Sequence, residues 1–449
     1  MQSTNPYNSV LIKEYQELSS EAINQKIDIA EITFQKWKKT SFAERAKLMN
    51  TLADLLEQDK KNLGNLITQE MGKPITQSIA EVEKCAWVCR HYAQHTEEKL
   101  QDKIIKTEAS KSFVKYEPLG VILAIMPWNY PFWQYFRFFA PNIMAGNVGV
   151  LKHASNVCGS ALAIEEIILK AGFPVGVSQT LLASSSKIEK IIANKIVKAA
   201  TLTGSFGAGS AVAAHCGKYI KKTVLELGGN NALIVFDDAD LDQAAETIYT
   251  ARFQNTGQSC IAGKRLLVQE SVSDKLLEKL VTIIKTKKCG NPLDKETEIG
   301  VLAEEKFALE LKMQMDNSIE KGAKILIRRK QEKAFFEPTI LTNVKPNMEV
   351  FKEETFGPLL AVTTFKTENE AIKLSNDSEF GLGVSIFTND EARIKRMIPL
   401  LNEGAVFVNE LVKSDPRLPF GGIKNSGYGR ELSDDALFEF MNVKTVFIK

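Results

Sequence analysis

Between residues 148 and 236 the sequence alternates short apolar runs with amphipathic segments, and this alternation is the strongest constraint on the fold. The apolar runs have the length of buried strands: "VGVLK" (148–152), "SQTLLA" (178–183), "KAATLTG" (198–204) and "ALIVF" (232–236). The segments between them have helical periodicity. Strands that alternate with helices in this way form βαβ units, so the sequence predicts a parallel sheet with a nucleotide site at the carboxyl ends of its strands.

The flanking regions extend this α/β pattern. Residues 20–100 repeat Leu, Ile and Ala at helical spacing, with a break at "MGKP" (71–74), and predict a helical layer. In segment 237–254, Asp240 is placed to cap a helix that delivers the chain to Cys260. A second α/β stretch runs from about 262 to 430. No repeat or low-complexity linker separates the two halves.

Charge and cysteine content argue against several functional classes. Lys and Arg (57) nearly balance Asp and Glu (55), which gives a net charge of +2, so nucleic acid and membrane surfaces are not expected partners. No signal peptide or apolar run of membrane-spanning length is visible, and we expect a cytoplasmic protein. The six cysteines form neither a disulfide framework nor a metal-ligand pattern, so no metal is predicted.

Three short segments carry side chains of complementary chemistry. They are "PWNYP" (127–131), "LELGGN" (225–230) and "GQSC" (257–260). Taken singly, Asn129 fits a turn residue, Glu226 a surface carboxylate and Cys260 a core thiol. Together, a thiol, a carboxylate and an amide are the nucleophile, base and oxyanion donor of a covalent acyl mechanism.

With these motifs the chain resembles the NAD(P)-dependent aldehyde dehydrogenases nearly end to end. The supporting motifs, in order, are "EMGKP", "PLGVILAIMPWNYP", "AGNVGVLKHAS", "LTGSFGAG", "LELGG", "GQSC", "EETFGP" and "PFGGIKNSGYGRE". Cys260 follows Glu226 by 34 residues, as in the family. The resemblance implies that Cys260 attacks the aldehyde and that Asn129 stabilises the oxyanion. Glu226 would activate the hydrolytic water, and members that transfer the acyl group to coenzyme A usually lack this glutamate.

The resemblance also implies a cofactor site for NADP or NAD. The residues that match the family's cofactor contacts are Trp128, Lys152, Gly204, Ser205, Glu354 and Phe356. Members that prefer NAD often carry a glutamate three residues after the lysine, where it repels a 2′-phosphate. Ser155 occupies that position here, and we therefore expect NADP to be accepted.

The aldehyde is predicted from fewer residues. Arg137 aligns with an arginine that holds the distal carboxylate in succinate-semialdehyde dehydrogenases, and Ser433 aligns with a serine of the same pocket. Many of those enzymes have a second arginine where this chain has Gln254, and Arg265 or Arg417 are candidates to compensate. Bacterial-type succinate-semialdehyde dehydrogenases are the subgroup that the sequence resembles most.

Two alternatives stay open at this point. Arg137 fits a structural salt bridge as well as a substrate contact. The aromatic residues Phe132, Trp133, Tyr135 and Phe136 fit the tunnel of a dehydrogenase for neutral medium-chain or aromatic aldehydes. A catalytically silent member of the family is disfavoured because Cys260, Glu226 and Asn129 are all present.

The family's architecture gives the expected domains. We predict a Rossmann-type dinucleotide-binding domain over residues 1–102 and 118–229 and an α/β catalytic domain over 230–432. Segments 103–117 and 433–449 alternate polar and apolar residues as exposed edge strands do, and they predict a small β element for assembly into a homodimer or homotetramer.

Overall fold

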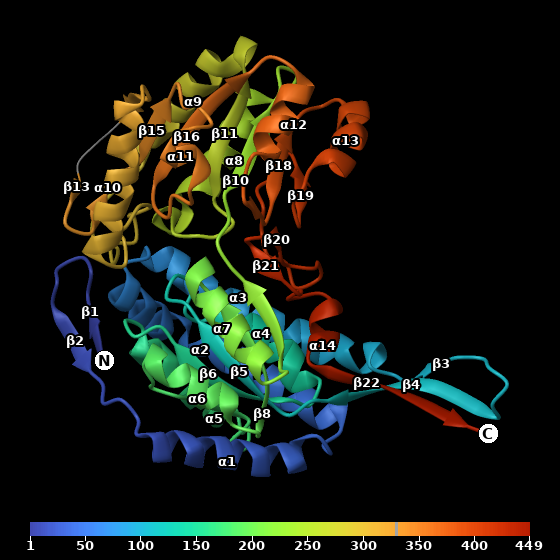
Figure 1. Cartoon of the computed structure of the whole chain (residues 1–449). Helices are drawn as coiled ribbons and strands as arrows, with labels where there is room; N and C mark the ends of the chain where they lie inside the picture. The colour runs from blue at the N-terminus through green and yellow to red at the C-terminus, as the bar shows by residue number, and fades with distance from the viewer. Residues whose placement is uncertain (328–330) are drawn as a thin grey trace.

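Two open α/β sheets, one in each half of the molecule, organise the fold of the computed structural model, which describes residues 1–327 and 331–449 (Figure 1). The first sheet has the strand order β21 (Gly427–Tyr428), β9 (Lys222–Glu226), β8 (Val197–Thr203), β5 (Val121–Met126), β6 (Val148–His153) and β7 (Ser178–Thr180). Its strands are parallel except for β21. Three of the strands predicted from the alternation lie in this sheet as β6, β7 and β8, whereas the fourth, 232–236, belongs to the second sheet as β10.

Seven helices of the described chain surround the first sheet. They are α1 (Ser20–Trp37), α2 (Phe42–Met71), α3 (Ile75–Lys99), α4 (Trp133–Met144), α5 (Cys158–Lys170), α6 (Ile188–Ala193) and α7 (Phe206–Lys218). Two of them, α2 and α3, pack on α4 rather than on the sheet itself. The predicted helical layer corresponds to α1, α2 and α3. Its break at "MGKP" is built by Gly72, whose φ of 79° ends α2 in the left-handed region that favours glycine.

The second sheet is the framework of the other half. Its order is β12 (Lys324–Ile327), β15 (Thr339–Thr342), β16 (Leu359–Phe365), β11 (Gly263–Gln269), β10 (Asn231–Val235), β18 (Val384–Phe387) and β19 (Val406–Val408). Only the β12–β15 pair is antiparallel. The accompanying helices are α8 (Leu241–Phe253), α9 (Ser273–Thr286), α10 (Glu305–Glu320), α11 (Glu349–Lys352), α12 (Glu368–Asn376) and α13 (Glu391–Met397). Asp240 caps α8 as expected, accepting hydrogen bonds from the N–H groups of Asp242 and Gln243.

A third, antiparallel sheet extends away from the body of the molecule (Figure 1). It consists of β22 (Met441–Ile448), β4 (Lys111–Pro118) and β3 (Lys103–Ile104). β22 and β4 pair along eight residues from Met441–Pro118 to Ile448–Lys111, which brings together the two predicted edge-strand segments. Their role in assembly remains a prediction.

The remaining elements are short. They are β1 (Gln2–Thr4), β2 (Leu11–Glu14), β13 (Gln331–Glu332), β14 (Phe335–Phe336), β17 (Phe380–Gly381), β20 (Ile423–Lys424) and α14 (Asp435–Glu439). Strand β21 falls within the predicted catalytic range 230–432, yet it pairs with β9 of the first sheet. The chain beyond β19 thus returns to the first half and brings Glu431 near β8 and α4.

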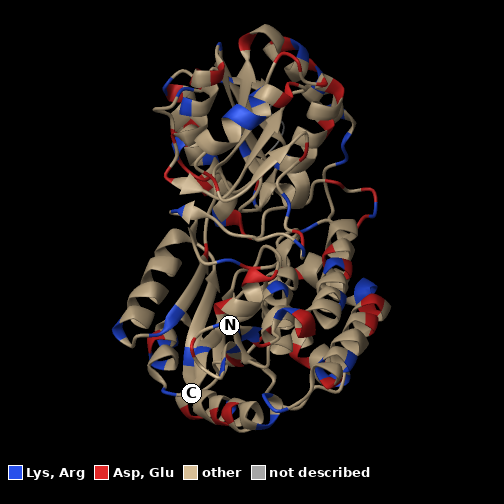
Figure 2. Ribbon diagram, turned by 90° about the vertical axis from the view of Figure 1, so that its right-hand side faces the viewer, with Lys and Arg blue, Asp and Glu red and all other residues tan. Residues whose placement is uncertain are grey.

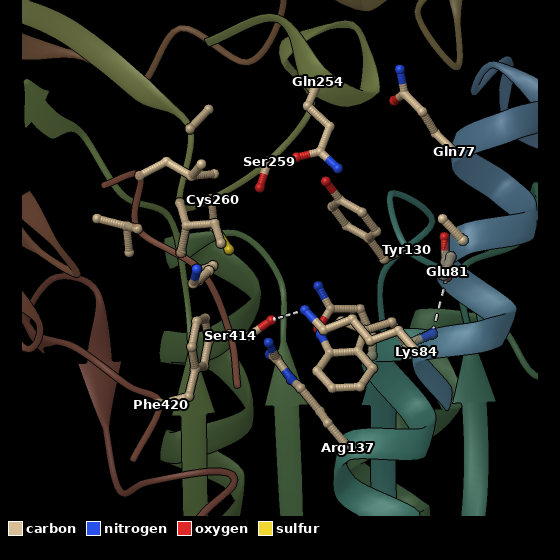
Figure 3. A pocket seen from close by; sticks show the side chains of 18 of the residues that line it. Gln77, Glu81, Lys84, Tyr130, Arg137, Gln254, Ser259, Cys260, Ser414 and Phe420 are labelled. Carbon is tan, nitrogen blue, oxygen red and sulfur yellow. Dashed lines mark hydrogen bonds between the residues drawn. The ribbon is translucent and has the colours of Figure 1, made fainter. Parts of the chain in front are cut away.

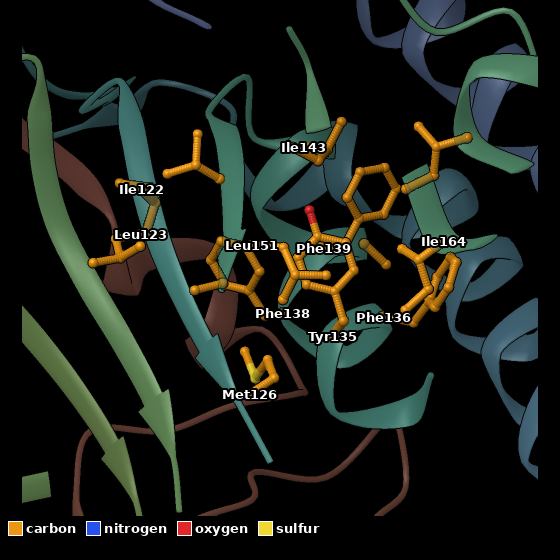
Figure 4. Close-up of a cluster of buried hydrophobic side chains, with 14 of the residues drawn as sticks. Ile122, Leu123, Met126, Tyr135, Phe136, Phe138, Phe139, Ile143, Leu151 and Ile164 are labelled. Carbon is orange, nitrogen blue, oxygen red and sulfur yellow. The ribbon is translucent and has the colours of Figure 1, made fainter. Parts of the chain in front are cut away.

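Helix α4 is buried along its whole length, and this corrects one expectation from the sequence. Phe132, Tyr135 and Phe136 have no exposed surface and pack into the core between α4 and the first sheet, where Figure 4 shows Tyr135 and Phe136. The Tyr135 hydroxyl is satisfied there by Ser178 at 2.6 Å. These three aromatic side chains therefore stabilise the fold and do not line a tunnel, whereas the fourth candidate, Trp133, lines a cavity beside Cys260.

Charged side chains are distributed over the surface in both signs (Figure 2). Within the described residues, no helix is long and apolar enough to cross a membrane.

Candidate active site

Cys260 lies in the loop between α8 and β11, where two cavities meet. The chain leaves α8 through a tight turn in which Asn255 (φ 55°) and Thr256 (φ 54°) are both in the left-handed region. The Asn255 amide stabilises this turn by donating to the carbonyl oxygens of Asn129 (2.9 Å) and Gln258 (3.0 Å). Such strain is typical of functional loops, because the surrounding contacts must hold it in place.

The first cavity, of about 180 Å³, is lined by three cationic residues, and we call it the cationic cavity (Figure 3). They are Lys84, Arg137 and Lys413, and Lys413 pairs with Glu410 at 2.8 Å. The lining of this cavity includes Gln77, Glu81, Lys84, Tyr130, Trp133, Gln134, Arg137, Gln254, Ser259, Cys260, Ser414 and Phe420. The second, of about 260 Å³, is the aromatic cavity and includes Trp128, Asn129, Gln134, Thr203, Gly204, Ser205, Gly228, Cys260, Phe307, Glu354 and Phe356. Cys260 and Gln134 line both, so a thiol separates the two spaces.

The aromatic cavity is built by loops that follow neighbouring parallel strands. β5 ends just before Trp128 and Asn129, β8 just before Gly204 and Ser205, and β9 just before Gly228. The carboxyl ends of adjacent parallel strands meet at one edge of a sheet, which is why these separate motifs converge. This edge is the expected ligand position in an open α/β sheet.

The lining of the aromatic cavity fits a dinucleotide. The Trp128 ring stacks on Phe307 at 4.9 Å and meets Phe356 edge-on at 5.7 Å, which gives flat apolar walls. Ser205 caps α7, accepting a hydrogen bond from Ala208 N–H at 3.4 Å, and the start of a helix favours a phosphate group. Glu354 is only half-buried, and it accepts the Gly229 N–H at 3.0 Å at the cavity wall.

Lys152, near the end of β6, and Ser155, on the β6–α5 connection, do not line the aromatic cavity. Lys152 is half-buried, and burial lowers the pKa of its ammonium. Ser155 is exposed and lines a separate cavity beside Asn156 and Lys306. No carboxylate stands at position 155, so the position does not repel a 2′-phosphate.

The thiol of Cys260 is protonated at neutral pH in this environment. Burial raises its pKa to about 11, Arg137 and Lys264 lower it, and the carboxylates of Glu354 and Glu226 raise it further. A thiolate is the nucleophilic form, so a bound ligand or a base must assist in removing the proton. The described structure shows no hydrogen bond to the backbone N–H of Cys260, which leaves this group available to an oxyanion.

Lys264 anchors the loop that carries Cys260. Its fully buried Nζ donates to the carbonyl oxygens of Ser259 (2.8 Å) and Cys260 (2.9 Å) and pairs with Glu354 at 3.1 Å. The loop that carries the thiol is thereby tied to a wall of the aromatic cavity. Lys264 was not predicted from the sequence, although a lysine at the start of a buried strand is an unusual placement.

Asn129, in the loop after β5, lines the aromatic cavity together with Cys260. Its Nδ2 donates to the Gln258 carbonyl at 3.1 Å, and among the described residues its Oδ1 has no hydrogen-bond partner. A primary amide carries two N–H donors, so one remains for a ligand oxygen. This arrangement fits the predicted oxyanion role.

Glu226 is buried at the end of β9, and neither carboxylate oxygen has a hydrogen-bond partner among the described residues. Desolvation, followed by repulsion from Glu431, raises its pKa well above the ordinary value, while Arg137 and Arg430 counteract the rise. Its surroundings therefore favour the protonated form of this carboxyl group. A role as base requires a water or a changed contact that stabilises the carboxylate.

The Arg137 guanidinium already has partners within the protein. Its Nε forms a buried salt bridge with Glu431, and its Nη2 donates to Thr203 Oγ1 at 3.1 Å. The guanidinium lies over the Phe420 ring at 4.6 Å. Arg137 does line the cationic cavity, so a contact with substrate stays a prediction, but the alternative, a structural salt bridge, is present.

The other proposed substrate contacts differ in position. Gln254 lines the cationic cavity. Ser433 instead lines a separate cavity with Arg417, and its hydroxyl bonds Asp435 at 3.0 Å. Arg265 donates to four backbone carbonyls of the second half, including those of Asn230 and Ser375, and lines neither cavity at Cys260. The structure thus brings Gln254 and Arg137 to the thiol, but neither Ser433 nor the two compensating arginines.

Comparison with known proteins agrees with this geometry. The model of the aldehyde dehydrogenase family matches residues 1–446. A probable NADP⁺ succinate-semialdehyde dehydrogenase of Synechocystis sp. is 47% identical over 99% of this chain and 98% of its own. The NADP⁺ succinate-semialdehyde dehydrogenase 1 of Mycobacterium bovis is 43% identical over the same shares. The crystal structure of succinic semialdehyde dehydrogenase from Streptococcus pyogenes with NADP⁺ superposes with a TM-score of 0.97 at 34% identity, covering 100% of this chain and 99% of that one.

The chain therefore belongs to the aldehyde dehydrogenase family, and the resemblance seen in the sequence is confirmed over its whole length. It is an NAD(P)-dependent oxidoreductase with the α/β fold of that family.

Proposed function

We propose that this enzyme oxidises succinic semialdehyde to succinate with NADP⁺. The observation that carries the proposal is the position of Cys260 between a cavity that fits a dinucleotide and a cavity that contains Lys84 and Arg137. Cationic side chains in a cavity that small favour a small anionic aldehyde. The names of relatives at 43 to 47% identity support the same substrate and cofactor.

The residues suggest how the reaction proceeds. The thiolate of Cys260 attacks the carbonyl carbon, and the oxyanion receives hydrogen bonds from Asn129 Nδ2 and the Cys260 N–H. A bound NADP⁺ supplies the hydride acceptor, which leaves a thioester on the sulfur. Glu226 then takes a proton from water as the water attacks the thioester, releasing succinate and the thiol.

Residues of the aromatic cavity, of β6 and of the β6–α5 connection hold the cofactor in this proposal. Ser205 and the start of α7 receive the pyrophosphate, Glu354 the nicotinamide ribose, and Lys152 the adenine ribose. Ser155 allows a 2′-phosphate. We expect NADP⁺ to be used in preference to NAD⁺.

A ratio of rates tests the proposal directly. The experiment compares kcat/KM for succinic semialdehyde and for butanal, with NADP⁺ and with NAD⁺. The two aldehydes share four carbons and differ in the terminal carboxylate, so we expect a ratio well above ten. A Cys260→Ala variant is the control and should be inactive with both. A ratio near one would favour a dehydrogenase for neutral aldehydes instead.

A further inference from the structure

One charge in the cationic cavity has no counter-ion among the residues that the structure describes. Lys84, on α3, is half-buried, and its Nζ donates to Ser414 Oγ at 2.7 Å and lies 4.3 Å from the centre of the Trp133 ring. A hydroxyl and an aromatic ring stabilise an ammonium group, but neither carries a negative charge. No carboxylate of the described residues forms a salt bridge with Lys84.

The acidic side chains near Lys84 already have other partners. Glu81 pairs with the buried Lys73 and accepts the N–H groups of Phe132 (2.9 Å) and Trp133 (3.0 Å). Asp415 accepts two hydrogen bonds from the guanidinium of Arg417, at 2.8 and 2.6 Å. Turning either carboxylate toward Lys84 would break these contacts, so the ammonium stays uncompensated.

Arg137 differs from Lys84 in this respect. Its charge is balanced by Glu431, so the pair contributes no net charge to the cavity. Figure 3 shows the Arg137 guanidinium, the Lys84 amine and the Cys260 sulfur directed toward the same space. The charge left for a ligand carboxylate to balance is therefore that of Lys84.

We propose that Lys84, together with the Ser414 hydroxyl, binds the carboxylate of the aldehyde substrate and sets the specificity of the enzyme. The inference rests on the proposed function and identifies the group that recognises the anion. The aldehyde carbon lies at Cys260 while the carboxylate replaces the missing counter-ion of Lys84. Arg137 then acts mainly through Glu431, as part of the cavity wall.

The matching substrate class is a short aldehyde with a carboxylate at its far end. The cationic cavity holds about 180 Å³, and it is closed by aromatic rings on the side of Trp133 and Phe420. A neutral aldehyde of the same length fits the space but leaves the ammonium unpaired. Discrimination therefore comes from the charge rather than from the volume.

The test replaces Lys84 by Met, which keeps the length and removes the charge, and by Arg, which keeps the charge. In Lys84→Met we expect the ratio of kcat/KM for succinic semialdehyde over butanal to fall about 10- to 100-fold, as for the loss of a charged hydrogen bond. The loss should appear in KM. Lys84→Arg should recover part of the ratio. Lys99→Met is the matched control, because Lys99 is on the same helix and outside this cavity.

If a variant has too little activity for kinetics, the binding of succinate is tested without turnover, by its protection of Cys260 from alkylation. Succinate should slow the alkylation of Cys260 by iodoacetamide in the wild type and in Lys99→Met, but not in Lys84→Met. A ratio within threefold of the wild type in Lys84→Met, or undiminished protection by succinate, would overturn the assignment of Lys84 alone. A wild-type ratio near one would overturn the proposed substrate, and the role of Lys84 with it.

Discussion

The two cavities that meet at Cys260 differ in how their walls are assembled. One wall of the aromatic cavity comes from loops that directly follow β5, β8 and β9, three neighbouring strands of one sheet. The second half adds Phe307, Glu310, Glu354 and Phe356. The cationic cavity takes its residues from α3, α4 and the segment 411–414, which are far apart in the sequence. The first is constrained by strand order and retains contiguous motifs. The second depends on the packing of separate helices and loops.

Removing the oxyanion donor should have the largest effect on turnover. Asn129→Ala should lower kcat about 10²- to 10³-fold for charged and neutral aldehydes alike, because the lost hydrogen bond acts on the carbonyl oxygen that both share. Steady-state rates with succinic semialdehyde and butanal measure this, and the Kd of NADP⁺ by fluorescence titration is the control. A loss confined to one aldehyde would contradict the division between the two cavities.

Replacing Arg137 and replacing Lys84 should affect the stability of the protein differently. Arg137→Met leaves Glu431 buried without its partner, which typically costs about 3 kcal/mol or more and lowers the melting temperature by about 5 °C. Lys84→Met removes a charge that has no counter-ion and should not destabilise the protein. Thermal unfolding of both variants tests this contrast. Equal losses would mean that Lys84 has a structural counter-ion in solution.

On the cofactor side, a single carboxylate should change the choice of nucleotide. Ser155→Glu places a negative charge where the 2′-phosphate is expected, and kcat/KM with NADP⁺ should fall about tenfold while that with NAD⁺ is retained. The ratio between the two aldehydes should not move. Ser155→Ala serves as the control. Unchanged use of NADP⁺ in Ser155→Glu would place the 2′-phosphate elsewhere.

The sequence predicted the cofactor side better than the aldehyde side for a physical reason. Strand periodicity placed the motifs around Asn129, Gly204 and Gly228 at the ends of parallel strands, and the sheet then had to bring them together. Nothing local indicated that Glu431 would return to pair with Arg137 across 294 residues of chain. The contact depends on β21, a two-residue strand, and so short an element has no periodicity to detect.

Lys84 was missed for a related reason. In the sequence, Lys84 does not differ from the other charged residues of an amphipathic helix. Its role is indicated only by the structure, in which the neighbouring carboxylates pair with other residues. The same applies to Phe132, Tyr135 and Phe136: their apolar character fits either a tunnel or a core. Only the packing of α4 against the first sheet decides for the core.

The smallest expected effect is a dependence of specificity on pH. Burial and the neighbouring Arg137 lower the pKa of Lys84 to about 8, while Glu81, Asp415 and the Cys85 thiol oppose the shift. The protonated amine is the form that binds a carboxylate, so the preference should be complete below this pKa and lost as pH rises through it. At pH 8.5 the ratio of kcat/KM for succinic semialdehyde over butanal should be about fourfold lower than at pH 6.5. Taking the ratio cancels the titration of Cys260, which both aldehydes share. Lys84→Arg should show no such decline, since a guanidinium stays charged over this range. A parallel decline in that variant would assign the titration to another group and leave the cationic cavity without its proposed pH dependence.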